Sequence, residues 1–245
     1  MFEGKTWWIV GASEGLGAAL AQELDAAGAR LVLSARSAEK LATLAGGLRD
    51  ARAVAMDVTD PASVSRAVAD AGDVDCLIYA AGQYEPMSAA EWQSEEVLRM
   101  VDVNLVGALR VLGEVVPQMV AKDRGRIAIV GSLAGFAGLP GVMGYGVSKA
   151  ALMHLAENML VDLKDTGVRV QRINPGYIRT RLTAKNDFRM PQIMEPRDAA
   201  REVVRALRSG RFSTSFPRPF AWLFQLGSLL PPRLFQRLLF GKGKR

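Results

Sequence analysis

Apolar runs and helix-like segments alternate along most of the 245-residue chain, and this constrains the fold more than any other feature. Uninterrupted apolar runs are typical of strands covered on both faces, as in a parallel sheet. Six such runs occupy residues 6–12, 29–35, 52–58, 75–81, 125–132 and 168–174, and segments of helical pattern occupy 15–28, 37–48, 61–72, 94–123 and 144–167. The alternation predicts an α/β fold: a single-domain doubly wound parallel sheet with helices on both faces.

A seventh strand is expected at residues 211–217, where Phe212, Thr214 and Phe216 alternate with smaller residues. Prolines at 217 and 219 would end it, because proline cannot donate to a sheet. We therefore divide the chain into a main domain, residues 1–217, and a C-terminal tail, residues 218–245.

The tail carries the excess positive charge of the protein. The chain has 31 basic and 25 acidic residues, and nine of the basic ones but no acidic one follow Glu202. Because residues 1–202 are mildly acidic, with 22 basic against 25 acidic residues, we expect no nucleic-acid partner. The tail pattern predicts two short apolar helices separated by Pro231 and Pro232. Such a segment fits peripheral membrane contact, and fits equally a helix packed over a cleft or on a partner subunit.

The compartment is predicted from what the sequence lacks. Cys76 is the single cysteine, so an intramolecular disulfide is excluded, and its apolar surroundings indicate an inert core thiol. We see no secretory signal and no run of about 20 apolar residues, so no membrane span is expected. We expect a cytoplasmic protein, with peripheral membrane association as the alternative.

A glycine-rich turn, VGASEGLG, follows the first predicted strand, with glycines at 11, 15 and 17. Glycines there allow a tight turn and a close approach of the backbone, and the helix that follows offers amides to a pyrophosphate. The second predicted strand ends near Arg36 with no acidic residue beside it. A guanidinium at this point favours the 2′-phosphate of NADP over NAD, which stays the alternative.

Further polar residues fall where predicted strands end or helices begin. Asp57, residues 80–82 and Ser132 follow strands, and Tyr145 begins a helix with Lys149 one turn later. Ligands of open α/β sheets bind outside the carboxyl ends of the strands, so we expect these groups to border one crevice. Asn104 lies inside a predicted helix, where asparagine is unfavourable unless its side chain has a partner or a task.

In these motifs the sequence resembles the short-chain dehydrogenases/reductases of about 250 residues. The resemblance covers roughly residues 6–180 and rests on the glycine turn, YAAG, VNLVG, Ser132, Y-x-x-x-K and INPGYIRT. It implies a catalytic group of Asn104, Ser132, Tyr145 and Lys149 and no metal. It also implies a nicotinamide cofactor held by Gly11, Ser13, Gly15, Leu16, Gly17, Arg36, Asp57, Val58, Ala80, Ala81, Gly82, Asn104, Tyr145, Lys149, Pro175, Gly176, Ile178 and Thr180.

The resemblance also implies roles. Tyr145 would exchange a proton with the substrate oxygen, Lys149 would lower the pKa of that phenol and hold the ribose, and Ser132 would orient the carbonyl. Asn104 would hold its helix and a proton-relaying water. The apolar segment 133–144 suggests an apolar ketone or aldehyde, or the matching alcohol, as substrate.

A metal site is disfavoured, because one histidine and one cysteine cannot supply the usual set of ligands. GSLAG around Ser132 lacks the nucleophile elbow of a serine hydrolase. A non-catalytic NADP(H) sensor on the same fold remains the alternative function, although Tyr145 and Lys149 are both present. The one histidine, His154, is expected to be a core or interface residue. The resemblance implies a homodimer. The family's usual C-terminal segment, which ends in a DGG-like turn, is missing from the sequence, and this puts a tetramer in doubt.

Overall fold

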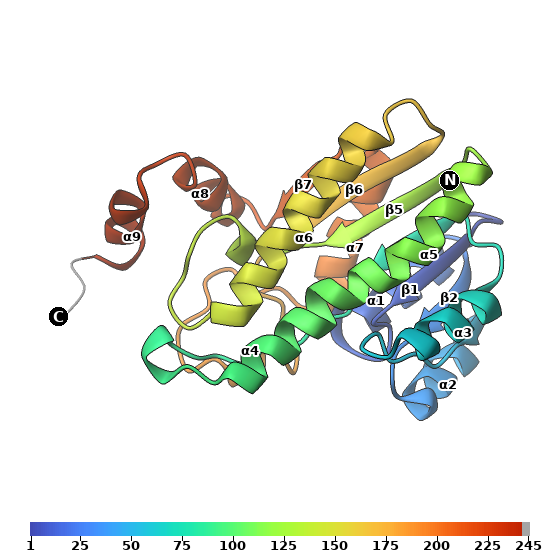
Figure 1. The fold of residues 1–245 in the computed structure, drawn as a ribbon, viewed down its shortest axis with the longest axis horizontal. Coiled ribbons are helices and arrows are strands. Elements are labelled where there is room, and N and C mark those ends of the chain that lie inside the picture. The colour runs from blue at the N-terminus through green and yellow to red at the C-terminus, as the bar shows by residue number, and fades with distance from the viewer. Residues whose placement is uncertain (242–245) are drawn as a thin grey trace.

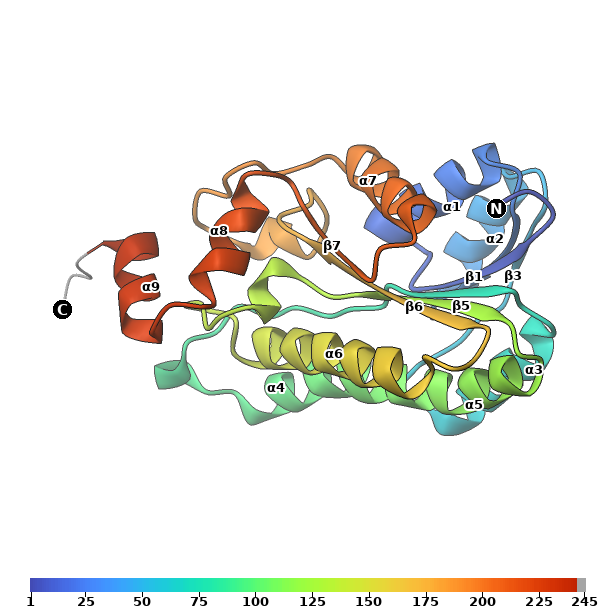
Figure 2. The same cartoon turned by 90° about the horizontal axis from the view of Figure 1, so that it is seen from above.

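A computed structural model describes residues 1–241 as a seven-stranded parallel sheet between two layers of helices (Figures 1 and 2). The strands are β1 Thr6–Val10, β2 Arg30–Ser34, β3 Ala51–Ala53, β4 Cys76–Tyr79, β5 Gly125–Val130, β6 Val168–Pro175 and β7 Ser213–Phe216. Their order in the sheet is β3-β2-β1-β4-β5-β6-β7. The predicted doubly wound fold is confirmed, including the seventh strand, and the winding reverses between β1 and β4.

The helices divide between the two faces of the sheet (Figure 2). α1 Gly15–Ala26, α2 Ala38–Gly46 and α7 Pro196–Ser209 cover one face; α3 Pro61–Ala71, α4 Ser94–Val101, α5 Gly107–Ala121 and α6 Met143–Asp162 cover the other. α8 Phe220–Gly227 and α9 Pro232–Phe240 follow the sheet, and short 3-10 turns lie at Ala89–Glu91, Leu133–Gly135 and Thr183–Lys185. α7 was not among the expected helices, although Pro196 at its first turn is a known start signal.

The two faces explain the uninterrupted apolar strands. Trp7 and Ile9 pack in the cluster under α1 and α7, whereas Trp8 and Val10 pack in the cluster under α3, α5 and α6. Successive strand residues point to opposite faces, so a strand covered on both must be apolar throughout. Cys76 is also buried in this core, as expected, and burial raises the pKa of its thiol to about 12.

Two predicted elements differ from the structure. The third strand was expected at 52–58 but spans only Ala51–Ala53, because it is an edge strand and the chain beyond it bonds to β2 less regularly. The long helix expected at 94–123 is interrupted by a π-helical turn at Asp102–Val106. Such turns add one residue per turn and are frequent at functional sites.

Candidate active site

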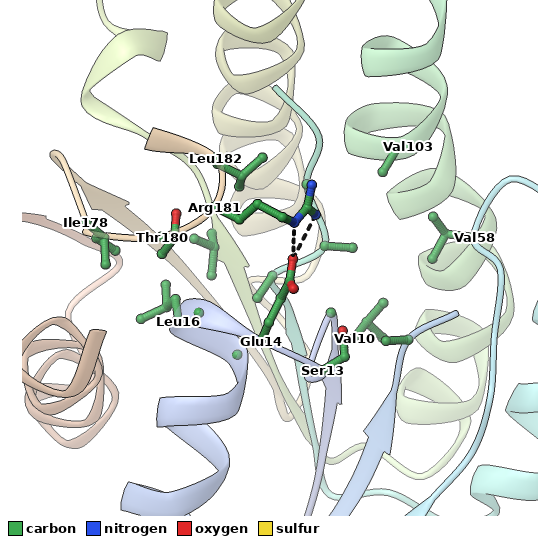
Figure 3. Close-up of a pocket in the computed structure, with 18 of the residues that line it drawn as sticks. Val10, Ser13, Glu14, Leu16, Val58, Val103, Ile178, Thr180, Arg181 and Leu182 are labelled. Atoms are coloured by element: carbon green, nitrogen blue, oxygen red, sulfur yellow. Dashed lines mark hydrogen bonds and ion pairs between the residues drawn. The ribbon is translucent and has the colours of Figure 1, made fainter. Parts of the chain in front are cut away.

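A cavity of about 430 Å³ lies at the carboxyl ends of the strands, beside the point where the winding reverses. It brings together seventeen of the residues that sequence reasoning assigned to cofactor binding. They are Gly11, Ser13, Gly15, Leu16, Gly17, Arg36, Asp57, Val58, Ala80, Ala81, Gly82, Tyr145, Lys149, Pro175, Gly176, Ile178 and Thr180. Asn104 and Ser132 do not line this cavity. Figure 3 shows its glycine-turn end.

The glycine turn forms one wall because its backbone lies where a side chain would not fit. Gly11 has φ +92°, and a Cβ built there would come within 2.6 Å of the Ala81 amide nitrogen. A Cβ on Gly17 would lie 2.0 Å from the Gly11 carbonyl oxygen. No side chain caps the first turn of α1, and no acidic residue lies in it. This end of the helix fits a pyrophosphate group.

Arg36 and Lys40 give the cavity a basic wall after β2. Burial raises the pKa of Asp57, but hydrogen bonds from Thr59 lower it, and the exposed Arg36 adds a smaller lowering. The net result is a pKa below the ordinary value. Lys40 forms an ion pair with Glu14, with 3.2 Å between Nζ and Oε2. The two cations fit the 2′-phosphate of NADP.

Glu14 joins the glycine turn to the segment after β6. Its Oε1 lies 2.7 Å from Arg181 (Figure 3). The Arg181 contact, together with that of Lys40, holds the pKa of Glu14 below its usual range. Lys185, in the same segment as Arg181, is likewise paired with an acidic side chain, that of Glu85.

Tyr145 and Lys149 lie on the first two turns of α6, and both line the cavity. The Lys149 ammonium is 5.7 Å from the centre of the Tyr145 ring and donates a hydrogen bond to the Val130 carbonyl oxygen at 2.9 Å. Lys149 is 4 % exposed, and this burial lowers its pKa to about 8. A partly neutral, buried amine of this kind is unusual outside functional sites.

The pKa of Tyr145 is raised, not lowered. Burial raises it, and the side chain of Ser132 acts in the opposite direction. In this arrangement the effect of burial prevails over the lowering that was expected from the Tyr145–Lys149 pair. Ser132, which is 7 % exposed, also accepts a hydrogen bond from the Ala134 amide at 3.1 Å.

Asn104 holds the π-helical turn to the loop after β4. Its Oδ1 accepts from the Gln83 amide at 2.6 Å, and its Nδ2 donates to the Gln83 carbonyl at 3.0 Å and to the Ser148 hydroxyl at 2.9 Å. Asn104 is fully buried, so these partners meet the need that its position in a helix implied. Its contacts hold the loop at Gly82, which faces Lys149, to α6, the helix that carries Tyr145 and Lys149.

Sequence reasoning missed part of the cavity. Glu14, Lys40, Val130, Gly131 and Arg181 line it as well, together with Val10, Ala35, Ser37, Met56, Val103, Leu182 and Thr183. Several could have been found, since Val130 and Gly131 directly precede Ser132 at the end of β5. The contact between Arg181 and Glu14 could not have been found, because it spans 167 positions of the chain.

Two further side chains, His154 and Tyr84, do not line the cavity. His154 is exposed, its side chain at 75 %, so it is not a core residue and its role at an interface stays a prediction. Tyr84, not singled out before, packs edge-on against Tyr145 with 5.1 Å between ring centres. Its hydroxyl donates to Asn186 at 2.9 Å, so Tyr84 links the segment after β6 to Tyr145.

Comparisons with known proteins agree with this geometry. The short chain dehydrogenase family model matches residues 5–190. An uncharacterized oxidoreductase of Myxococcus xanthus is 36% identical over 239 residues, covering 94% of both chains. A solved short chain dehydrogenase from Burkholderia cenocepacia in complex with NADP is 26% identical, covers 98% of this chain and 99% of its own, and has a TM-score of 0.88. A short-chain dehydrogenase from Sphingobium yanoikuyae in complex with NADPH is 25% identical, covers 98% and 97%, and has a TM-score of 0.83.

The chain therefore belongs to the short-chain dehydrogenase/reductase family. It is an NAD(P)-dependent dehydrogenase/reductase with a Rossmann-like fold.

Proposed function

We propose that this enzyme uses NADPH to reduce an apolar ketone or aldehyde, or oxidises the matching alcohol with NADP. The observation that carries the proposal is the arrangement of the cavity. The glycine turn and two cations, Arg36 and Lys40, follow β1 and β2, Tyr145 and Lys149 lie on the helix that follows β5, two strands away from β1, and all of them line the one cavity. A nicotinamide dinucleotide spanning the cavity would supply a hydride when bound.

Tyr145 is the proposed general acid. At neutral pH its raised pKa keeps the phenol protonated, so the hydroxyl has a proton to donate to a carbonyl oxygen during reduction. Lys149, when protonated, would stabilise the phenolate that remains and lower its pKa in the loaded enzyme. Ser132 lies beside the phenol and would donate a hydrogen bond to the same oxygen.

Apolar side chains beside Ser132 support an apolar substrate. Leu133 is buried with Phe224 in a small cluster at the C-terminal end of the molecule, and Phe136 and Leu139 pack against it. Tyr177 stacks on both Phe188 and Phe220 at the same end, with ring centres 6.0 Å and 5.8 Å apart. A polar substrate would leave its hydrogen-bonding groups unpaired against these surfaces.

Titration of NADPH and NADH into wild-type enzyme and Arg36→Ala tests the cofactor assignment. Loss of a charged hydrogen bond should weaken NADPH binding by about 10- to 150-fold and leave NADH binding unchanged. Arg49→Ala is the matched control, because Arg49 is exposed near α2 but does not line the cavity. Equal NADH and NADPH affinity in wild type, unaffected by the substitution, would overturn the NADP preference.

Turnover of apolar aldehydes by Tyr145→Phe tests the catalytic assignment. The rate should fall by about a hundredfold or more, with cofactor affinity retained, because only the transferable proton is removed. Tyr84→Phe removes a phenol that contacts the Tyr145 ring but bonds to Asn186, so it should cost far less. Cofactor binding without turnover of any carbonyl compound or alcohol would favour the sensor alternative.

A further inference from the structure

The C-terminal arm, residues 218–241, projects beyond the end of the sheet (Figures 1 and 2). It consists of α8 and α9, connected through Pro231. The two helices touch at Gly227, where a Cβ would lie 2.0 Å from the Phe235 ring, so only glycine allows this approach. Phe224 and Phe235 stack edge-on with 6.0 Å between ring centres. The arm is therefore a packed helical pair.

The inner face of the arm is attached to the main domain. Ala221, Phe224 and Phe235 are buried with Leu133, which directly follows Ser132. Gln236 also donates a hydrogen bond to the Gly138 carbonyl. These contacts account for one face of α8 and of α9 and leave the other free.

The outer face of the arm is unusually apolar. Of the sixteen large apolar side chains that are exposed in residues 1–241, seven belong to the arm: Trp222, Leu223, Leu226, Leu229, Leu230, Leu234 and Leu238. Leu229 is 81% exposed and Leu226 67%. The α8 residues Trp222 and Leu226 are one turn apart, as are Leu234 and Leu238 on α9, so each helix presents an apolar stripe. An apolar surface of this extent marks an interaction site.

The C-terminal sequence is also basic, without any acidic residue. Residues 218–245 include six basic side chains and no Asp or Glu. Arg218, Arg233 and Arg237 are exposed, and none has an ion-pair partner within the part of the chain that the structure describes. The Arg218 guanidinium lies over the Trp222 ring, 5.8 Å from its centre. Aromatic and basic side chains interleaved in this way fit the boundary between lipid headgroups and acyl chains.

We propose that the arm docks on the surface of an anionic lipid bilayer. Leucine and tryptophan side chains would enter the boundary between headgroups and acyl chains, and the arginines would contact acidic headgroups. No helix of residues 1–241 is long and apolar enough to cross a membrane, so the arm would lie in the plane of the surface. Self-association through the arm is disfavoured, because a two-fold contact would bring two all-basic segments together. Nucleic acid would leave the leucines in water.

Docking would also orient the enzyme. The inner face of the arm contacts Leu133, beside the side chains that the proposed function assigns to the substrate carbonyl. This consequence rests on the proposed function: an apolar substrate dissolved in the bilayer would reach the active site from the docked side. The docking itself needs neither cofactor nor substrate.

Vesicle flotation of the full chain, without cofactor, tests the proposal. The protein should float with vesicles of phosphatidylcholine mixed with phosphatidylserine and remain below with pure phosphatidylcholine. Arg233→Gln with Arg237→Gln should weaken binding about fivefold per charge removed. Leu226→Gln with Leu229→Gln should also abolish flotation, because it removes apolar contact while leaving the charge. Both pairs are exposed, so folding should persist.

A matched control removes two exposed basic groups outside the arm, Arg66 on α3 and Lys164 after α6. This variant, Arg66→Gln with Lys164→Gln, should float like wild type. Wild-type protein that ignores the mixed vesicles overturns the proposal, as does flotation unaffected by either arm variant. Arm variants that change only the molecular mass in light scattering would identify a subunit contact instead. NADPH affinity is measured separately on each variant, so a failure of lipid binding and a failure of the proposed function are distinguishable.

Discussion

Lys149 combines two demands that oppose each other. The proposed chemistry uses its positive charge, yet its burial near the start of α6, where the residue is 4 % exposed, disfavours that charge. Burial lowers its pKa to about 8, whereas an unfolded lysine titrates near 10.4. Between these values the unfolded chain binds more protons than the folded one, so stability rises with pH.

We expect the free energy of unfolding of wild type, relative to Lys149→Met, to rise by about 2 kcal/mol between about pH 7 and pH 9.5. Below the folded pKa the penalty of burying the charge is fully present, and it disappears as pH rises toward the unfolded pKa. Urea unfolding of both proteins across this range measures the difference, in which other titrating groups cancel. A difference that stays flat or falls would show that Lys149 titrates normally.

Glu14 is the second residue with an unusual place, since an acid lines a cavity expected to hold phosphates. It is neutralised by Arg181 and Lys40. We expect Glu14→Gln to raise the affinity for NADPH relative to NADH about fivefold, because it frees Lys40 and removes a negative charge. Fluorescence titration of both cofactors measures the ratio. Glu39→Gln, an exposed acid on α2 outside the cavity, should leave it unchanged; an equal shift in both variants would refute a local effect.

At the level of elements, the π-helical turn between α4 and α5 connects the loop after β4 to α6. Asn104 bonds both to Gln83, after β4, and to Ser148 on α6. The turn therefore fixes the distance between the loop that lines the cavity and the helix that carries Tyr145 and Lys149. A regular helix would present a different side chain to Gln83.

Asn104→Ala should lower the free energy of unfolding by about 2–3 kcal/mol, because the Gln83 backbone groups lose their partners. It should also weaken NADPH binding, since Gly82 is no longer held. Gln171→Ala is the control: Gln171 is buried and bonds to the Ala206 and Arg211 carbonyls, far from the cavity. Chemical unfolding and cofactor titration measure the two effects. Unchanged NADPH affinity in Asn104→Ala would limit its role to stability.

At the scale of the whole molecule, α5 and α6 lie side by side on one outer face (Figures 1 and 2). Each presents an exposed stripe without formal charge: Leu109, Gly113, Pro117 and Val120 on α5, and Val147, Ala150, His154, Asn158 and Val161 on α6. Paired uncharged stripes of this length fit a two-fold contact, so we propose a homodimer through this face.

Val161→Arg should convert the dimer to a monomer, because a two-fold contact would bury the introduced charge twice. Light scattering coupled to gel filtration measures the molecular mass. Ala69→Arg places the same side chain on exposed α3 and should leave the mass unchanged. A wild-type monomer, or a variant that remains dimeric, would remove α5 and α6 as the interface.

The sequence alone predicted the sheet and most of the cavity, because both depend on local signals. A strand covered on both faces must be apolar along its length, as TWWIV is, and the chain positions after strands mark one edge of a parallel sheet. Gly11, Arg36, Tyr145 and Lys149, which line the cavity, were predicted in this way. Their assembly at one edge follows from the order of strands and helices.

The tertiary structure decided what depends on distant partners. It placed Arg181 on Glu14, turned the Asn104 side chain to Gln83 through a π-helical turn, and packed Tyr84 against Tyr145. It also set the direction of the Tyr145 pKa, since burial and not the i, i+4 spacing controls the phenol in this arrangement. Spacing fixes which groups can meet, but solvent exclusion and the partners of each charge are set only when the whole chain is packed.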